Sequence, residues 1–331
     1  MKLSKLGEFG LIERIRKATP RGRGVRVGIG DDAAWLDCRS RTLLVTTDLL
    51  IEGIDFDLRW SSFYGLGYKS LAVNLSDLAA MGGSPAYLTL SLGIPVDFKT
   101  EDVEEFYRGV RSLAAPSGVS LVGGDTSAAS CFIISVSLIG HCPHKPVMRS
   151  GAKAGDDLYV TGTLGDSALG LELLKKRKGK TKKGAAAYLV SRHQFPSARL
   201  KAGALLARER LATAMIDVND GLLQDLSHLC KSSAIGATVR EESLPFSPAF
   251  RTLAGPRRTL CALTGGEDYE LLFCVRRKDR SRLEKIKRRL GVSITRIGEC
   301  LPAGKEIRVI DGKGKPVSFP SRGYDHFQGR P

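Results

Sequence analysis

The sequence lacks the features that mark membrane, secreted and zinc-binding proteins. No apolar run approaches the ~18 residues that a membrane-spanning helix needs. The opening segment 1–17 has no apolar core of the kind found in signal peptides. The seven cysteines are scattered and form no C-x-x-C pair, which argues against a disulfide framework and a structural zinc site. We therefore expect a cytoplasmic protein with reduced cysteines and no membrane association.

Several common catalytic motifs are also missing. A P-loop is excluded because Leu174 stands where the first glycine should precede the Gly-Lys-Thr at 179–181. The dinucleotide-binding fingerprint fails at Ser70, where its last glycine belongs. There is no G-x-S-x-G or H-E-x-x-H segment, and the chain has only five histidines. We therefore expect no covalent catalytic nucleophile.

Charge of one sign is in excess but is concentrated in two places. The 51 lysines and arginines outnumber the 35 acids, for a net charge of +16. Segment 175–183 holds seven basic residues in nine, and segment 276–289 holds nine in fourteen. Neither segment has the interleaved aromatic residues that stack on bases. We expect solvated surfaces there, and a non-catalytic nucleotide- or nucleic-acid-binding module remains an alternative of a different class.

The 331 residues, 42% of them apolar, are enough for two domains with their own cores. A Pro-, Gly- and base-rich stretch at 141–156 is the best boundary, so we expect domains at 1–148 and 149–331. Alternating β-rich and amphipathic runs favour an α+β or α/β fold. The expected strands are 42–47, 86–94, 132–140, 157–162, 236–240, 269–275 and 294–299; the expected helices are 8–17, 65–81, 101–115, 165–176, 197–210, 220–232 and 278–290.

Acidic residues recur at the ends of apolar runs and after glycine turns. Asp77 lies inside an alanine-rich helix, where a buried carboxylate needs a cation or hydrogen bonds. Mg²⁺ typically shares a few carboxylates with substrate phosphates, so such acids favour a metal-bridged nucleotide site. The other acids of this kind are Asp31, Asp32, Asp48, Asp125, Asp217, Asp220, Glu267 and Asp268.

Simpler roles stay open for part of this set. Asp31 and Asp268 are equally expected to form turns or caps, and Asp217 or Asn219 could cap the helix that follows. Two glycine pairs, at 123–124 and 265–266, would let the backbone approach a ligand. Arg149 is a candidate phosphate contact through its forked donors, with an interdomain surface charge as the alternative.

Ten segments in order then identify a family resemblance. They span residues 7 to 327 and read GEFGLI, GIGDDAA, TTDLLIEG, YKSLAVNLSDLAAMGG, LVGGDT, RSGAKAGD, YVTGTLGDSALGL, IDVNDGLLQDL, LTGGEDYEL and GYDHF. Together they resemble the thiamine-monophosphate kinases, which belong to a wider group of aminoimidazole ribonucleotide synthetase-like ATP-binding proteins. The resemblance implies a two-domain α+β fold, with N-terminal domains that pair into a dimeric β-barrel and a C-terminal α/β sandwich domain.

The resemblance also implies a reaction and a set of ligands. ATP, with several Mg²⁺ ions, would phosphorylate thiamine phosphate to thiamine diphosphate in a homodimer. The positions that match metal ligands are Asp32, Thr46, Thr47, Asp48, Asp77, Asp125, Asp217 and Asp220. The positions that match nucleotide contacts are Tyr107, Gly124, Asp125, Arg149 and Asn219, and those that match thiamine-phosphate contacts are Asp55, Glu267 and Tyr324.

Two positions depart from the family pattern, and related activities are the alternatives. Asp55 stands where the family usually has histidine, and Asn219 where it usually has serine. A selenophosphate synthetase would want a reactive cysteine in its N-terminal glycine-rich segment, whereas the first cysteine here is Cys38. A hydrogenase-maturation protein would want a cysteine at the extreme C-terminus, whereas this chain ends in Asp-His-Phe-Gln-Gly-Arg-Pro.

Overall fold

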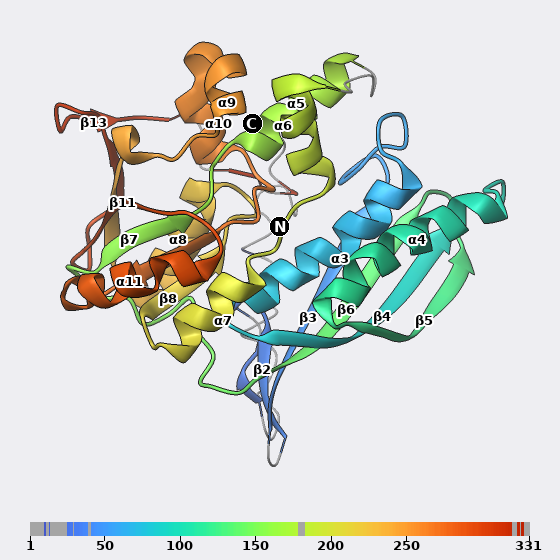
Figure 1. Ribbon diagram of the computed structural model, residues 1–331, viewed down its shortest axis with the longest axis horizontal. Coiled ribbons are helices and arrows are strands. Elements are labelled where there is room, and N and C mark those ends of the chain that lie inside the picture. Colours follow the sequence, from blue (N-terminus) through green and yellow to red (C-terminus); the bar gives the residue numbers. More distant parts are fainter. Residues whose placement is uncertain are drawn as a thin grey trace.

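The computed structural model contains two mixed β-sheets with helices packed on them (Figure 1). It describes residues 10, 13, 25–28, 30–38, 41–177, 183–319, 323–324 and 326–327. The expected helix 8–17 lies almost wholly outside these residues, as do positions 178–182 of the first basic segment. None of the helices in this described part is long and apolar enough to span a bilayer.

The first sheet has six strands in the order β1-β2-β3-β6-β4-β5 and is antiparallel except for the β4–β5 pair. Helices α3 and α4 pack on one of its faces and bury one large apolar cluster (Figure 1). The elements are β1 Val25–Val27, β2 Ala34–Cys38, β3 Arg41–Ile51, α3 Phe63–Ala80, β4 Ser84–Ile94, α4 Thr100–Ser117, β5 Ser120–Ala128 and β6 Ile133–Cys142.

The second sheet has seven strands in the order β13-β12-β9-β11-β7-β10-β8 and is antiparallel except for the β12–β9 pair. Apolar clusters on its two faces hold side chains of α8 and α10 on one side, and of α7 and α11 on the other. The strands are β7 Asp157–Thr161, β8 Ala212–Asp217, β9 Gly236–Arg240, β10 Leu271–Val275, β11 Ile294–Leu301, β12 Ile307–Ile310 and β13 Pro316–Val317.

Seven helices accompany this sheet, and short 3₁₀ turns extend some of them. The helices are α5 Asp166–Arg177, α6 Gly184–Gln194, α7 Leu200–Arg208, α8 Leu222–Ser233, α9 Pro248–Leu253, α10 Arg258–Thr264 and α11 Arg280–Ile286. The 3₁₀ turns are Glu241–Ser243, Gly255–Arg257, Arg277–Asp279 and Lys287–Leu290. The predominantly antiparallel pairing and these helical layers make the chain a two-domain α+β protein.

Helix α3 links the two halves of the molecule. Ser62 caps its first turn by accepting the Gly65 N–H at 3.0 Å. Gly67 allows α4 to pack closely, because a Cβ there would lie 1.9 Å from the Phe106 carbonyl oxygen. At the other end, Ala79 and Ala80 pack into the apolar cluster that α7 and α11 form with one face of the second sheet. One helix can therefore carry polar side chains along the junction between the domains.

The seven expected strands are all present, with bounds that differ by up to four residues at an end. Strand β5 was missed because its Gly123-Gly124 pair is typical of a turn, and β8 because its sequence is short and alanine-rich. Helices α6, α9 and α10 were also missed. The expected helix 278–290 is a 3₁₀ turn, α11 and a second 3₁₀ turn, with Leu283 and Ile286 buried and the basic residues mostly exposed.

Candidate functional site

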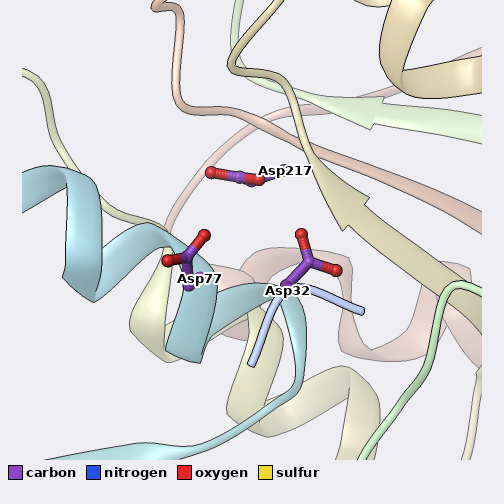
Figure 2. Close-up of side chains that lie close together, drawn as sticks. All are labelled: Asp32, Asp77 and Asp217. Atoms are coloured by element: carbon purple, nitrogen blue, oxygen red, sulfur yellow. The ribbon is translucent and has the colours of Figure 1, made fainter. Parts of the chain in front are cut away.

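Three carboxylates from distant parts of the chain face one another at the junction of the two domains. Asp32, Asp77 and Asp217 each offer one oxygen, and these oxygens lie within 4.8 Å of one another (Figure 2). Asp32 follows the turn at Gly30, which has a φ of +121°. Asp77 lies in the last turn of α3, and Asp217 ends β8. The fold thus gathers acids that lie 45 or more positions apart in sequence.

Hydrogen bonds orient each of these three acids. The Thr46 hydroxyl donates to Asp77 Oδ2 at 2.5 Å, and the Ser76 hydroxyl donates to Asp217 Oδ2 at 2.6 Å. Arg149 donates from Nε and a terminal nitrogen to the two oxygens of Asp32, both at 3.0 Å. Arg149 therefore makes the forked contact that suits a carboxylate or a phosphate.

Two of the three acids, Asp77 and Asp217, are harder to ionise than ordinary carboxylates. Burial and the repulsion of Asp48, Asp217 and Asp32 hold the pKa of Asp77 well above its usual range. Burial and the repulsion of Asp32 raise the pKa of Asp217 in the same way, although Ser76 and Arg149 oppose the shift. A bound cation would remove this repulsion, and oxygen ligands suit a hard divalent ion.

Two more acids extend the cluster. Burial, together with the charge of Asp55, raises the pKa of Asp48 to about 6. Its Oδ2 atom is buried and has no hydrogen-bond partner in the described part of the chain. Burial and the charge of Asp32 raise the pKa of Asp31 to about 7, although the Arg149 backbone N–H donates to its oxygens at 3.2 and 3.3 Å. A buried carboxylate oxygen without a hydrogen-bond donor suits the coordination of a cation.

A pocket of about 660 Å³ opens beside the cluster. Asp48 and Lys69 of the first domain line it, as do Asp220 and Glu267 of the second. Tyr269 also lines it, and its pKa is raised well above the usual range by burial and by the charges of Glu267, Asp48, Asp217 and Asp220. The acid cluster and the pocket therefore lie around the same side chain.

An ion pair crosses the pocket from one domain to the other. Lys69 Nζ on α3 lies 2.5 Å from Glu267 Oε1, and His193 Nδ1 on α6 lies 3.1 Å from Glu267 Oε2. Burial alone would raise the pKa of Glu267, but Lys69 and His193 hold it below its usual range. Burial and the charge of Lys69 lower the pKa of His193. Glu267 is therefore ionised and His193 is neutral near pH 7.

The backbone that carries Glu267 is strained and tightly held. Glu267 and Tyr269 have positive φ angles of +66° and +50°, which residues with a Cβ rarely adopt. The Glu267 N–H donates to the Asn219 carbonyl oxygen at 2.6 Å, and the Tyr269 N–H to that of Val218 at 2.9 Å. These bonds join the Glu267 segment to the Asp217–Asp220 loop.

Side chains from a third segment close the far side of the pocket. Tyr324 and His326 line it, and their rings meet edge to face with centroids 4.7 Å apart. His326 Nε2 lies 3.9 Å from Asp55 Oδ1, while the Ile51 N–H donates to Asp55 Oδ2 at 2.8 Å. Burial raises the pKa of Asp55, although Ile51 and His326 oppose the shift.

Asp225 organises the loop that presents Asn219 and Asp220 to the pocket. Its Oδ2 accepts the backbone N–H groups of Asn219, Asp220 and Gly221 at 3.0, 3.1 and 3.2 Å. Gly221, with a φ of +115°, is the residue before helix α8, so neither Asp217 nor Asn219 caps that helix as the sequence had allowed. The loop therefore depends on a buried acid that lies within α8 itself.

Comparison with known proteins identifies this arrangement. The sequence-family models of AIR synthase related protein match residues 30–142 (N-terminal domain) and 153–311 (C-terminal domain). The thiamine-monophosphate kinase of Escherichia coli (strain K12) is 42% identical over 325 residues, which cover 97% of this chain and 98% of the relative. The chain belongs to the thiamine-monophosphate kinase family.

Solved structures of this family have the same fold. AaThiL complexed with AMPPCP and TMP is 36% identical, has a TM-score of 0.85, and is matched over 98% of this chain and 99% of that one. The thiamine-monophosphate kinase of Stenotrophomonas maltophilia K279a is 38% identical, has a TM-score of 0.77, and is matched over 94% and 98%. These identities favour the thiamine-monophosphate kinases over the related ATP-using synthetases.

The positions that match the family's ligands fall into two groups in this structure. Asp32, Thr46, Asp48, Asp77, Arg149, Asp217 and Asp220 lie at the cluster or the pocket, together with Asp55, Asn219, Glu267 and Tyr324. Tyr107 packs into the α4 side of the first core, and Gly124 and Asp125 lie on the exposed strand β5. The described contacts bring none of these last three to the cluster.

Thr46 and Thr47 point to opposite faces of β3, as neighbours in a strand do. Thr46 contacts Asp77, whereas the exposed Thr47 donates to the Val136 carbonyl oxygen at 2.9 Å and accepts from Ser137 Oγ at 3.0 Å. The structure therefore brings the first hydroxyl to the acid cluster and leaves the second on the other face of the sheet.

Gly265 and Gly266 line the pocket, and a residue of each glycine pair also packs against the protein's own backbone. A Cβ on Gly124 would lie 1.9 Å from the Leu90 carbonyl oxygen, and one on Gly266 would lie 2.4 Å from that of Asn219. Asp268 accepts hydrogen bonds from the backbone N–H groups of Gly165 and Ser167 at 2.6 and 3.1 Å. It therefore has a structural role in the turn at the start of α5.

Three residues of the site escaped the sequence reasoning. Lys69, like Asp77, is a charged residue within an apolar helix, but it is not among the expected site residues. Asp225 lay at a position typical of the polar face of α8, and His193 lay on a helix that was not expected. Of the three, only Lys69 carries a signal in the sequence, because it interrupts an otherwise apolar helix.

Proposed function

We propose that the acid cluster and the pocket beside it form one active site. The chain is an ATP-dependent kinase that phosphorylates thiamine phosphate to thiamine diphosphate, as its family does. The observation that carries the site assignment is the convergence of Asp32, Asp77 and Asp217 beside a pocket lined by both domains. We place the domain boundary between residues 148 and 149, and the enzyme in the cytoplasm.

The cluster has the chemistry of a magnesium site. The convergence of three carboxylates fits a hard divalent cation, as do the raised pKa values of Asp77 and Asp217 and the buried Oδ2 of Asp48 without a donor. Asp32, Asp77 and Asp217 would hold it, joined by the other positions that match the family's ligands, namely Thr46, Thr47, Asp48, Asp125 and Asp220. Bound Mg²⁺ ions supply charge neutralisation for the phosphate groups of ATP and its acceptor.

The residues around the cluster then bind and orient the two substrates. Arg149 is the phosphate contact, already aligned by its forked bonds to Asp32. Asn219 supplies an amide donor and acceptor at the nucleotide, and Tyr107, Gly124 and Asp125 are the remaining nucleotide contacts that the family resemblance assigns. At the pocket, Glu267 pairs with the cationic thiazolium ring, Tyr324 stacks on the rings, and Asp55 lies beside them.

This site needs no general base and no covalent intermediate. The attacking oxygen belongs to a phosphate whose second pKa is ~6, so it is largely ionised near neutral pH. The difficulty is to bring two polyanions together in line, which positioning and charge neutralisation achieve. This explains why the site is rich in aspartate. The buried His193 contacts Glu267 and stays neutral, so it is not needed as a base.

The open side of the first sheet favours a homodimer with a shared barrel. Leu49 and Tyr87 alternate along β3 and β4 with side chains that face the core, and their exposed fractions are 55% and 53%. On the edge strand β5, Leu121 and Val122 are 43% and 58% exposed (Figure 1). Such an apolar, unpaired edge is what a second copy would cover. Light scattering should give the mass of two chains, and Val122→Lys should shift it toward one.

The direct test supplies ATP, Mg²⁺ and thiamine phosphate and measures thiamine diphosphate and ADP. We expect the two products in equal amounts, and no turnover when EDTA removes the metal. If thiamine phosphate stayed unconverted for hours at a micromolar concentration of enzyme, the proposal would be overturned. Salt-sensitive nucleic-acid binding without ATP turnover would instead support the binding-module alternative. The clustered acids argue against that alternative, because they should repel a polyanion.

A further inference from the structure

The Lys69–Glu267 ion pair lies inside the substrate pocket and joins the two domains. Lys69 is 6% exposed, and it is the one buried lysine or arginine among the described residues that line the pocket. The other two, Arg59 and Lys175, are exposed at its rim. A buried lysine needs an anionic partner, and the contact found for Lys69 is Glu267 at 2.5 Å.

The two halves of this pair differ in how firmly they are held. Glu267 keeps a second contact through His193 at 3.1 Å, and its backbone is bonded to Asn219. Lys69 has a flexible four-carbon stem, and Glu267 is its one ion-pair partner within the described part of the chain. On that helix Lys69, Val73 and Asp77 are spaced four apart, so they follow one face from the pocket to the acid cluster. The ammonium group can therefore leave Glu267, while Glu267 stays in place.

Thiamine phosphate carries the same two charges as this ion pair. Its thiazolium ring is cationic, and its phosphate is largely a dianion near neutral pH. We propose that Lys69 binds the phosphate of thiamine phosphate and that the substrate inserts into the Lys69–Glu267 pair, exchanging one internal ion pair for two with the ligand. This inference rests on the proposed function of the pocket, and it makes Lys69 a specificity-determining residue.

The exchange predicts how the enzyme selects its acceptor. Thiamine has the thiazolium ring but no phosphate, so its binding to Glu267 would leave Lys69 buried without an anion. An unpaired buried charge is strongly unfavourable, whereas a ligand that supplies both charges leaves none. The pocket should therefore prefer thiamine phosphate to thiamine by rejecting the ligand that is incomplete.

The first experiment compares Lys69→Met with the unchanged enzyme. We expect the KM for thiamine phosphate to rise by about 30-fold or more, because one partner of a buried charge pair is lost. The inhibition constant of thiamine as a competitor should stay the same or fall. If Lys69 only positioned Glu267, both constants would worsen together, and that parallel loss would overturn the proposal. Lys176→Met, an exposed lysine of α5 that does not line the pocket, is the matched control and should change neither constant.

A second measurement needs no variant and covers the case in which Lys69→Met fails to fold. In the unchanged enzyme, inorganic phosphate should tighten thiamine binding by roughly tenfold in calorimetry, because the two ligands together complete the exchange. Binding of thiamine that is independent of phosphate would overturn the inference. Wild-type turnover of thiamine phosphate tests the proposed function separately, so an active enzyme without this coupling refutes only the role of Lys69.

Discussion

Two groups of buried acids in this molecule are treated in opposite ways. In the second domain, both carboxylate oxygens of Glu270 accept hydrogen bonds, which come from Thr161, Arg192 and Arg199. At the junction, Asp77 and Asp217 face each other and Asp32, with hydroxyl donors from Thr46 and Ser76. Both groups are buried, so burial alone does not separate a structural acid from a functional one.

The pKa directions show the same difference. Burial raises the pKa of Asp157, but Arg280 of α11 and Arg296 of β11 outweigh it and lower the pKa below its usual range. The pKa values of Asp77 and Asp217 are raised instead, because their nearest charges are other acids. A structural acid such as Asp157 is paired with an arginine of the same chain. An acid that binds a cofactor is left to repel its neighbours until the cation arrives.

The largest expected effect comes from Asp217→Asn in the cluster. Turnover should fall roughly 10²- to 10³-fold, because a ligand is lost from the proposed metal site that neutralises the transferring phosphate group. The metal-free variant should melt at the same temperature as the unchanged enzyme or higher, since one repulsive charge is gone. Steady-state kinetics and thermal unfolding check the two parts. Asp157→Asn is the control and should lower the melting temperature while leaving turnover intact; near-normal turnover of Asp217→Asn would remove it from the metal set.

The second expected effect tests the supporting acids. Glu270→Gln removes the anion shared by the half-buried Arg192 and Arg199, of which Arg192 keeps a 4.0 Å contact with Asp166, and we expect the free energy of unfolding to fall by about 3 kcal/mol. Urea unfolding monitored by circular dichroism measures it. Glu284→Gln, which breaks only the exposed pair with Lys287, should change the same quantity by less than about 1 kcal/mol. Equal losses in the two variants would contradict the comparison.

The third effect is the pH dependence of the metal-free protein. The pKa values of Asp48 and Asp31, about 6 and about 7 against a usual 3.8, mean that the folded state holds protons that the unfolded state has released. Their contribution to stability is therefore present at about pH 4 and is lost as the pH rises to about 7. The melting temperature of the metal-free protein should fall by several degrees over this pH interval.

Saturating Mg²⁺ with ATP should reverse this drop and raise the melting temperature, because it binds only the folded state and supplies the missing positive charge. The gain should be larger at pH 8 than at pH 5, where protons already neutralise part of the cluster. A melting temperature that Mg-ATP leaves unchanged at both pH values would contradict a metal site at these acids.

The smallest effect should come from Asp225→Asn, an acid supported by the backbone alone. The amide oxygen can still accept from Asn219, Asp220 and Gly221, so we expect a stability loss of only about 1 kcal/mol. The KM for ATP should rise more than kcat falls, since the loop that holds Asn219 is loosened. A tenfold fall in kcat at an unchanged KM would show that Asp225 acts beyond this loop.

Local patterns predicted much of this architecture but not its exceptions. Asp77 could be recognised because a charge inside an apolar helix is costly wherever the helix packs. Asp225 could not, because its position on α8 is equally suited to solvent, and only the fold of residues 219–221 around it buries it. Strand β5 was hidden for a similar reason: Gly124 usually signals a turn, and here it permits close pairing with Leu90 of β4.

The sequence by itself determined the family, the reaction class and the acids that any metal site would use, because residue type and order carry that information. Only the tertiary structure decided which acids meet. Asp32, Asp77 and Asp217 converge while Asp157 and Glu270, equally buried, are paired with arginines. It also placed Lys69 opposite Glu267 inside the pocket. The physical reason is that charge interactions depend on distance and burial, which a linear chain does not contain until two domains pack along one helix.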